Sequence, residues 1–397
     1  MTPPARALAG LRVLDFSIMM AGPYCGRLLA DLGADVVKIE PPEGDDMRLR
    51  APRRGADSTY FGQLNAGKRS VALDLKNPEA LALARRLAGQ ADVVLENFRP
   101  GVMERVGLGA AALRALHPRL IYCSISGYGQ SGLAAGRPAY AMIVQAASGF
   151  ERTLMRYADD RERPAPTATF VADLLGAVYA FGAVQTALVQ RARTGEGQTI
   201  DVALMDGMLN LLVYELQEAQ FAVTTPRQTY GPVAAADGDL LVVPITERNF
   251  EAVCEVTGSA ALRTDPRFAT LPLRNANWQA LMTAVQAWTR ERPLAECLRL
   301  LEAAGVPCSA YAEPADALAD PHLRERGVFQ PVADASGVFL GVNAPWRLSA
   351  SDARLGERVP RVGEHRASVI ADWLAADDSE LARLEAAGAF GELNPKP

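Results

Sequence analysis

The sequence predicts an α/β protein, with a large Rossmann-like domain built on a parallel sheet and a smaller α+β domain. Two observations carry this prediction. The first 130 residues alternate apolar strands with helical segments, and strands that are apolar throughout are typical of a parallel sheet covered on both faces. Residues 225–327 mix short strands with amphipathic helices, which is typical of an α+β domain.

Each element of the large domain has its own local signal. Strands are predicted where β-branched apolar residues cluster, and helices where apolar residues recur every three or four positions up to a glycine or proline. The predicted strands span residues 11–16, 35–40, 92–98, 120–125 and 199–203, and the predicted helices include 22–32, 78–87 and an apolar helix that starts near Asp173. Ligand sites of such a sheet lie at the carboxyl ends of its strands.

The domain boundaries are placed where the pattern changes. We expect the large domain to cover residues 1–224, the small domain 225–327, and the segment 328–397 to return to the large domain as a hairpin followed by two helices. In the small domain we expect strands at 240–243 and 307–311 and helices at 250–256, 278–289 and 294–304.

Composition excludes several classes of protein. The 397 residues are 49% hydrophobic and carry a net charge of −5 at a pI of about 5.5, so neither nucleic acid nor an anionic membrane is an expected partner. We expect no stretch that is long and apolar enough to span a membrane, and no signal peptide. Five dispersed cysteines without a CxxC pair indicate reduced thiols in a cytoplasmic protein. Three isolated histidines provide neither a metal site nor a Ser-His-Asp triad.

A glycine motif after the fourth strand, Gly127–Gly132, matches the GxGxxG dinucleotide fingerprint. That fingerprint requires the third glycine to open a helix whose amino end receives the pyrophosphate. Here a loop containing Pro138 follows, and the motif stands after the fourth strand instead of the first. We therefore do not expect a nicotinamide or flavin site.

Asp173 has two interpretations. It stands where a polar run gives way to an apolar helix, and aspartate at a helix start is commonly an N-cap that accepts backbone N–H bonds. On local features alone the N-cap interpretation is the stronger one. The surrounding motifs favour a catalytic carboxylate instead.

Those motifs resemble the class III coenzyme A transferase family, which includes formyl-CoA:oxalate and carnitine CoA-transferases and has the 2-methylacyl-CoA racemases as relatives. The resemblance covers nearly the whole chain. The matching segments are Arg12–Asp15, Ala21–Cys25, Leu29–Glu40, Leu64–Ser70, Glu96–Gly101, Ser126–Gly129, Gln145–Gly149, Asp173, Thr194–Gln198, Gly305–Pro307 and Gly363–His365.

The resemblance implies that Asp173 is a nucleophile. Its carboxylate would attack an acyl-CoA thioester and carry the CoA as an aspartyl thioester to an acceptor acid, without ATP. The implied substrates are an acyl-CoA donor such as succinyl-CoA and a small organic acid, with no tightly bound cofactor. The family also implies a homodimer of two interlocked chains.

The resemblance further implies a groove for CoA. Phe98 would stack on adenine and Lys68 or Arg105 would meet phosphate, although a lone phenylalanine is more often part of the core. The arginines Arg48, Arg50, Arg53 and Arg54 are interpreted as a solvated loop. The implied groove residues are Met20, Ala21, Leu64, Lys68, Asn97, Phe98, Arg99, Arg105, Arg137 and Tyr140.

Departures from the family pattern narrow the function. Where this chain has Met20, formyl-CoA transferases carry a glutamine, and where it has Pro41 and Pro138 they carry basic residues. Their glycine-rich loop has no counterpart in this chain. Oxalate and formate are therefore not expected substrates. Met19 and Met20 indicate an apolar, adaptable acyl pocket. Two alternatives stay open: a racemase, which would need a histidine near Tyr140, and a catalytically silent CoA-binding protein.

Overall fold

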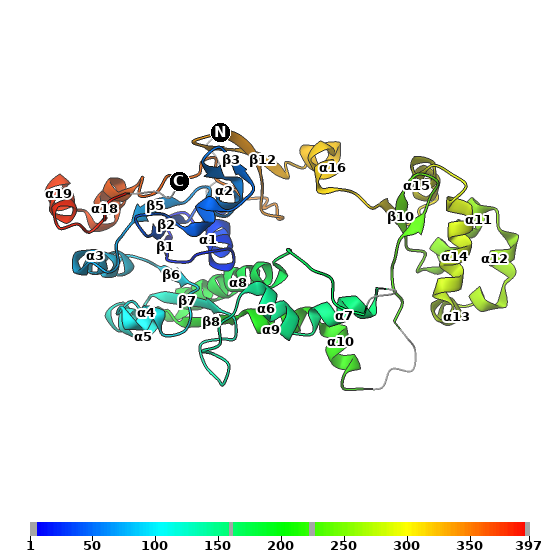
Figure 1. Cartoon of the computed structure of the whole chain (residues 1–397), viewed down its shortest axis with the longest axis horizontal. Coiled ribbons are helices and arrows are strands. Elements are labelled where there is room, and N and C mark those ends of the chain that lie inside the picture. The colour runs from blue at the N-terminus through cyan, green and yellow to red at the C-terminus, as the bar shows by residue number, and fades with distance from the viewer. Residues whose placement is uncertain (1–5, 159–161, 222–226, 394–397) are drawn as a thin grey trace. The chain divides into compact units, whose positions relative to one another are not determined.

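The protein was described from a computed structural model that covers residues 6–158, 162–221 and 227–393. The large domain is built on a six-stranded sheet in which every strand pair is parallel, and this confirms the predicted α/β class (Figure 1). The strand order β5-β2-β1-β6-β7-β8 is the Rossmann order 3-2-1-4-5-6, so it reverses between β1 and β6. The strands are β1 (Arg12–Asp15), β2 (Asp35–Glu40), β5 (Arg69–Ala72), β6 (Val93–Glu96), β7 (Ile121–Ser126) and β8 (Thr199–Ala203).

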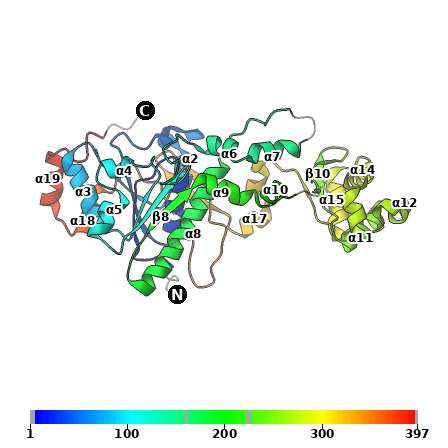
Figure 2. The ribbon, with the colours of Figure 1, turned by 90° about the horizontal axis from the view of Figure 1, so that it is seen from below.

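Helices cover both faces of this sheet, as the apolar strands predicted (Figure 2). One face packs against α1 (Ala21–Asp31), α6 (Ala141–Ala147), α8 (Val171–Thr194) and α9 (Leu204–Leu211). The other face packs against α3 (Pro78–Ala88), α4 (Val102–Arg105), α5 (Ala110–Leu116), α18 (Arg366–Leu374) and α19 (Asp378–Ala386). Strand β5 was absent from the predicted elements, because only two of its four residues are apolar.

Helix α8 corrects one expectation from the sequence. Its 24 residues include a window of mean hydropathy 1.4, so it is long and apolar enough by composition to cross a membrane, contrary to the expectation that no stretch is. Small buried residues let α8 approach its neighbours: a Cβ on Gly176 would stand 2.3 Å from a methyl group of Leu204. The opposite side of the helix exposes Leu174, Val178 and Val189.

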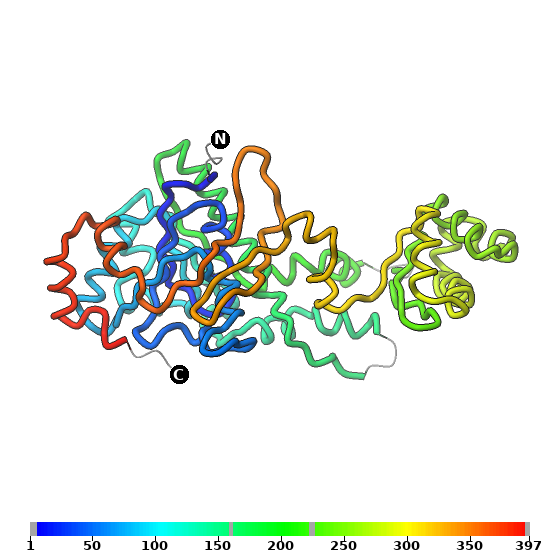
Figure 3. Tube along the Cα trace, turned by 90° about the horizontal axis from the view of Figure 1, so that it is seen from above, coloured from blue at the N-terminus to red at the C-terminus, as the bar shows by residue number. Residues whose placement is uncertain are grey.

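The C-terminal segment returns to the N-terminal part, where orange and red chain lies against blue (Figure 3). Strands β12 (Phe329–Asp334) and β13 (Gly337–Val342) form the predicted hairpin, and α18 and α19 are the two predicted terminal helices. Val332 and Phe339 of the hairpin pack with α2 (Thr59–Asn65) in one apolar cluster. Short elements complete this region: η1 (Asp46–Leu49), β3 (Arg53–Arg54), β4 (Asp57–Ser58), α7 (Phe150–Arg156), α10 (Val213–Glu218) and α17 (Pro321–Glu325).

The chain divides into two compact units, Met1–Leu216 with His322–Pro397, and Gln217–Pro321. The sequence placed these boundaries after residues 224 and 327. The second unit is an α+β domain, with an antiparallel sheet in the order β11-β10-β9 and its own apolar clusters. Its elements are β9 (Val233–Ala234), β10 (Asp239–Val242), α11 (Glu247–Thr257), α12 (Ala260–Thr264), η2 (Pro266–Phe268), α13 (Leu271–Ala276), α14 (Trp278–Thr289), α15 (Leu294–Ala303), β11 (Cys308–Ala310) and α16 (Pro314–Ala319).

Candidate active site

A cavity of about 770 Å³ lies at the carboxyl ends of β1, β6 and β7 in the large unit. The strand order reverses between β1 and β6, and the loops that leave these two strands diverge there, which is where doubly wound sheets bind ligands. Ile18–Ala21 follow β1, Asn97–Arg99 follow β6, and Gly127 follows β7. Asp173 of α8 is part of the same lining.

Asp173 is the third residue of α8, and it does not cap the helix. Phe170 occupies the N-cap position and makes no capping bond with its side chain, so the N-cap interpretation of Asp173 is wrong. The start of α8 is held by Gln145, whose Oε1 accepts from the Ala172 N–H at 3.3 Å. Burial raises the pKa of Asp173 to about 6, with no compensating charge or hydrogen bond from the described residues. The carboxylate is therefore ionised at neutral pH but poorly stabilised, which suits a nucleophile.

The loop after β1 carries a strained residue into the cavity. Met19 has a positive φ of 62°, which side chains other than glycine rarely adopt and which costs about 1–3 kcal/mol. The residue before it is clamped by Asn97: the Ile18 N–H donates to Asn97 Oδ1 at 2.8 Å, and Asn97 Nδ2 donates to the Ile18 carbonyl at 2.7 Å. Both ends of the Asn97 amide are thus used to fix the β1 loop, and the side chain positions the loop beside the cavity.

Methionines and a tyrosine line the cavity next to Asp173. Tyr60 donates a hydrogen bond to the sulfur of Met20 at 3.3 Å, and Met47 packs in the same apolar cluster. Burial and then the charge of Asp173 raise the pKa of Tyr60, which places that phenol near the carboxylate. The apolar part of the lining that Met19 and Met20 predicted therefore includes Met47 and Tyr60, which the sequence did not single out.

Two arginines contribute positive charge to this cavity. Arg99 and Arg50 are both exposed members of the lining. Arg99 was predicted, whereas Arg50 belonged to the run interpreted as a solvated loop. That interpretation is also wrong for two of its neighbours, because Arg48 donates to both carboxylate oxygens of Glu40 at 2.9 and 2.7 Å and Arg54 pairs with Asp334 at 2.6 Å.

Seven of the eleven predicted site residues line the cavity: Met20, Ala21, Asn97, Phe98, Arg99, Tyr140 and Asp173. Phe98 also packs against the core, as a lone phenylalanine more often does. The other four lie outside the lining. Leu64 is buried in an apolar cluster beneath the hairpin, and Arg105 and Arg137 are exposed.

Lys68 is the fourth residue outside the lining, and its geometry leaves no donor for a phosphate. The side chain is fully buried, and Nζ donates to Asp15 Oδ2 at 2.8 Å, to the Pro23 carbonyl at 2.8 Å and to Asn65 Oδ1 at 2.9 Å. These three bonds use all the hydrogens of the ammonium. Lys68 therefore stabilises the fold beneath the cavity.

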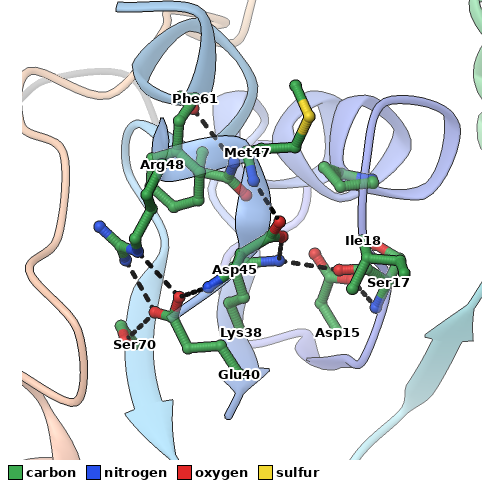
Figure 4. Close-up of polar contacts among 12 residues, drawn as sticks. Asp15, Ser17, Ile18, Lys38, Glu40, Asp45, Met47, Arg48, Phe61 and Ser70 are labelled. Carbon is green, nitrogen blue, oxygen red and sulfur yellow. Dashed lines mark hydrogen bonds and ion pairs between the residues drawn. The ribbon is translucent and has the colours of Figure 1, made fainter. Parts of the chain in front are cut away.

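A second buried ammonium, Lys38 of β2, lies in a polar cluster at the carboxyl edge of the sheet (Figure 4). It donates to the Ser17 carbonyl at 2.8 Å and pairs with Asp45 at 2.8 Å. Burial alone lowers the pKa of Lys38, but the carboxylates of Asp45, Asp15 and Glu40 outweigh it and raise that pKa. The lysine is therefore charged, and its partners lie in two loops whose following residues line the cavity.

The remaining sequence features do not form a second site. After Gly132 the chain forms turns and no helix before α6, so the glycine motif lacks the helix that a pyrophosphate requires. All five cysteines are free, and burial raises the pKa of Cys25 and of Cys123, as expected for core thiols. No group of three or more potential metal ligands occurs in the described part of the chain.

Comparison with known proteins places this site in a family. The model of CoA-transferase family III matches residues 8–366. The chain is 35% identical to succinate–glutarate CoA-transferase of Agrobacterium fabrum, over 92% of this chain and 95% of the relative. It is 34% identical to succinyl-CoA–D-citramalate CoA-transferase of Chloroflexus aurantiacus, over 96% and 98%.

Solved structures agree with this assignment. A CaiB/BaiF family protein from Brucella suis superimposes with a TM-score of 0.80 at 35% identity, covering 93% of this chain and all of that one. The Rv3272 protein of Mycobacterium tuberculosis gives 0.83 at 30% identity, over 93% and 100%. The family match, the relatives and the cavity at the strand-order reversal lead to one conclusion: the chain belongs to CoA-transferase family III and is a CoA-transferase.

Proposed function

We propose that this enzyme moves CoA from an acyl-CoA donor to a small organic acid through an aspartyl-CoA thioester on Asp173. The observation that carries the proposal is the state of that carboxylate. It lines the cavity, lacks a compensating charge among the described residues, and has a pKa of about 6 because of burial. A buried carboxylate that serves no cap and no ion pair costs stability, and such groups are concentrated at functional sites.

The exchange proceeds in balanced steps. The Asp173 carboxylate attacks the thioester carbonyl, the carbon–sulfur bond breaks, and a mixed anhydride and CoA thiolate form. The thiolate then attacks the aspartyl carbonyl of the anhydride, which releases the donor acid as a carboxylate and leaves CoA on Asp173. The acceptor carboxylate reverses both steps, so the thioester energy is kept throughout. The partial positive charge of the α8 amino end favours the negative charge that develops at Asp173.

The cavity lining supports these substrates. Arg50 and Arg99 provide guanidinium groups for the phosphates of CoA or for a substrate carboxylate, and Met20, Met47 and Tyr60 provide an apolar wall for the acyl chain. One relative is named for succinyl-CoA and D-citramalate and another for succinate and glutarate, which supports succinyl-CoA as the donor and a small organic acid as the acceptor. The CoA thioester is then a substrate, and the proposal requires no tightly bound cofactor.

The test is to trap the covalent intermediate. The enzyme is mixed with succinyl-CoA, treated with hydroxylamine and digested, and the peptide that contains Asp173 is weighed. We expect a hydroxamate on Asp173, or a CoA adduct when hydroxylamine is omitted. The matched control is Asp173→Asn, which keeps the shape of the side chain and should give neither product. Turnover of Asp173→Asn at the rate of the unmutated enzyme would refute the covalent route.

The racemase alternative has less support from the site. Tyr140 stands at the N-cap of α6, 65% exposed, where the racemases would need a histidine, and a phenol is less suited than an imidazole to removing an α-proton at neutral pH. None of the three histidines is part of the cavity lining. Exchange of the α-proton of a 2-methylacyl-CoA in D₂O, without an adduct on Asp173, would favour the racemase. Binding of CoA without either reaction would favour the silent protein.

We further propose that the enzyme is a cytoplasmic homodimer, interlocked as the resemblance implies. The stripe of Leu174, Val178 and Val189 along α8 supports a partner, because exposed apolar rows of this kind are typical of interfaces. The free cysteines support a reducing compartment. Light scattering during gel filtration should give twice the chain mass of 42.4 kDa. A monomer at micromolar concentration would refute the dimer.

A further inference from the structure

Lys38 is fully buried in β2, yet the proposed reaction gives it no task. A buried ammonium must be paired and hydrogen-bonded to be tolerated. Its two partners, the carbonyl of Ser17 and the carboxylate of Asp45, stand in different segments of the chain (Figure 4). Each of those segments continues into the wall of the cavity that contains Asp173.

The first segment leads to the strained methionine. Ser17 is anchored through both of its backbone polar groups, because its N–H donates to Asp15 Oδ1 at 2.9 Å and its carbonyl accepts from Lys38. Ile18 follows in the clamp of Asn97, and Met19 adopts its positive φ directly afterwards. A strained backbone conformation persists only where the surrounding structure over-determines it. The bond from Lys38 is part of that restraint.

The second segment leads to Met47. One oxygen of Asp45 accepts from the Met47 N–H at 2.9 Å and begins the short helix η1, while the other oxygen faces Lys38. Met47 packs with Met19 and Met20 and lines the cavity beside them. Through Asp45, the position of Met47 is thus tied to the same ammonium that restrains the loop of Met19.

We propose that Lys38 is a positioning residue, whose ammonium fixes the spacing between the two methionine-bearing segments and so sets the length of acyl group that the cavity accepts. The inference rests on the proposed function in one respect, that this cavity takes the acyl end of an acyl-CoA. Methionine side chains adapt to many shapes, so a wall built from them discriminates only if its backbone is held in place. A buried, hydrogen-bonded ion pair imposes a single geometry in the way that flexible side chains do not.

Asp45→Asn is the informative substitution. Asparagine is as good a helix cap as aspartate, so the bond to the Met47 N–H is kept while the charge that faces Lys38 is lost. The matched control is Asp31→Asn, which breaks the equally buried pair of Arg27 and Asp31 (2.9 Å) at the end of α1. Asp31 is not part of the cavity lining.

The measurement is the ratio of dissociation constants for two probes, the non-cleavable thioether analogues of acetyl-CoA and glutaryl-CoA, determined by titration calorimetry. We expect Asp45→Asn to change this ratio by about fivefold or more in favour of the longer analogue, because a loosened wall admits more acyl atoms. Asp31→Asn should lower thermal stability and keep the ratio of the unmutated enzyme. An unchanged ratio in folded Asp45→Asn would overturn the proposal.

A second variant covers the case in which Asp45→Asn does not fold. Asp45→Glu keeps the charge opposite Lys38 but lengthens the link to Met47, so it should also shift the ratio, and an unchanged ratio there overturns the inference. The probes bind without reacting, so the outcome is separate from the covalent chemistry. Absence of an adduct on Asp173 would refute only the proposed mechanism. Failure of the unmutated enzyme to bind either probe would refute both the mechanism and the role of Lys38.

Discussion

Asp173 should destabilise the folded protein at neutral pH, and replacing it by asparagine should therefore increase stability. Burial raises the pKa of this carboxyl from 3.8 to about 6, and each pKa unit is worth about 1.4 kcal/mol. Ionised Asp173 then costs roughly 3 kcal/mol, as an upper value because the side chain is only half-buried and water screens its charge. A neutral amide of the same shape avoids that cost.

The direction in which this stability cost changes with pH follows from proton linkage. The folded state binds its proton more tightly than the unfolded chain, so the cost is complete above pH 6, decreases as the pH falls from 6 towards 3.8, and is absent below 3.8. We expect Asp173→Asn to be more stable than the unmutated enzyme by up to about 3 kcal/mol at pH 8 and by about half as much at pH 5. Urea unfolding at the two pH values measures both differences.

A capping aspartate provides the matched control, because its substitution should act in the opposite direction. Asp377 accepts from the hydroxyl of Ser379 and from the N–H groups of Ser379 and Glu380 at the start of α19, and these bonds, the hydroxyl first, lower its pKa. Asp377→Ala should lower the free energy of unfolding, because the first turn of α19 loses its cap. If Asp173→Asn is also destabilised, or if its gain is the same at both pH values, the reasoning from burial is wrong.

Three further predictions concern activity and the residues around the cavity. The acid limb of kcat/KM should have its midpoint near pH 6, where Asp173 gains its charge, and a midpoint near 4 would contradict the burial of this group. Arg99→Gln should raise KM for the acyl-CoA by about tenfold, whereas Arg105→Gln, outside the lining, should change it little in the same steady-state assay. Lys68→Met should lower the free energy of unfolding by roughly 3–5 kcal/mol, because Asp15 keeps a buried charge without its partner; a loss below 1 kcal/mol in urea would refute this structural role.

The sheet was predictable because its strands carry their own signal. Strands buried on both faces are apolar along their length, and Val93–Glu96 and Ile121–Ser126 were found by that pattern alone. Arg69–Ala72 was not found, since a short edge strand with one polar half resembles a loop. The helix that starts near Asp173 was also predicted, but it begins at Val171, two residues earlier than expected. Because of this earlier start, Asp173 lies inside the first turn and does not cap the helix.

The functional residues likewise divide into those that the sequence could predict and those that it could not. Asn97 and Arg99 follow β6, which lies at the reversal of strand order, so their place in the cavity was predictable from the order of the elements, whereas Asp173 was predicted only from the family motifs. Lys68 and Arg50 were assigned to the wrong environments, because both were judged by charge and by neighbours in the sequence. Which side a charged side chain faces depends on packing between elements, and charge alone does not specify it.

The sequence by itself determined the parallel α/β architecture, the family and the carboxylate at the start of α8, because apolar periodicity and ordered motifs are local properties of the chain. Tertiary structure alone decided which cations are free. Lys68 is neutralised by Asp15, 53 residues away, and Lys38 joins Ser17 to Asp45 across the edge of the sheet. Burial and pairing of a charge are set by partners that are distant in the chain, and only folding brings those partners within hydrogen-bonding distance.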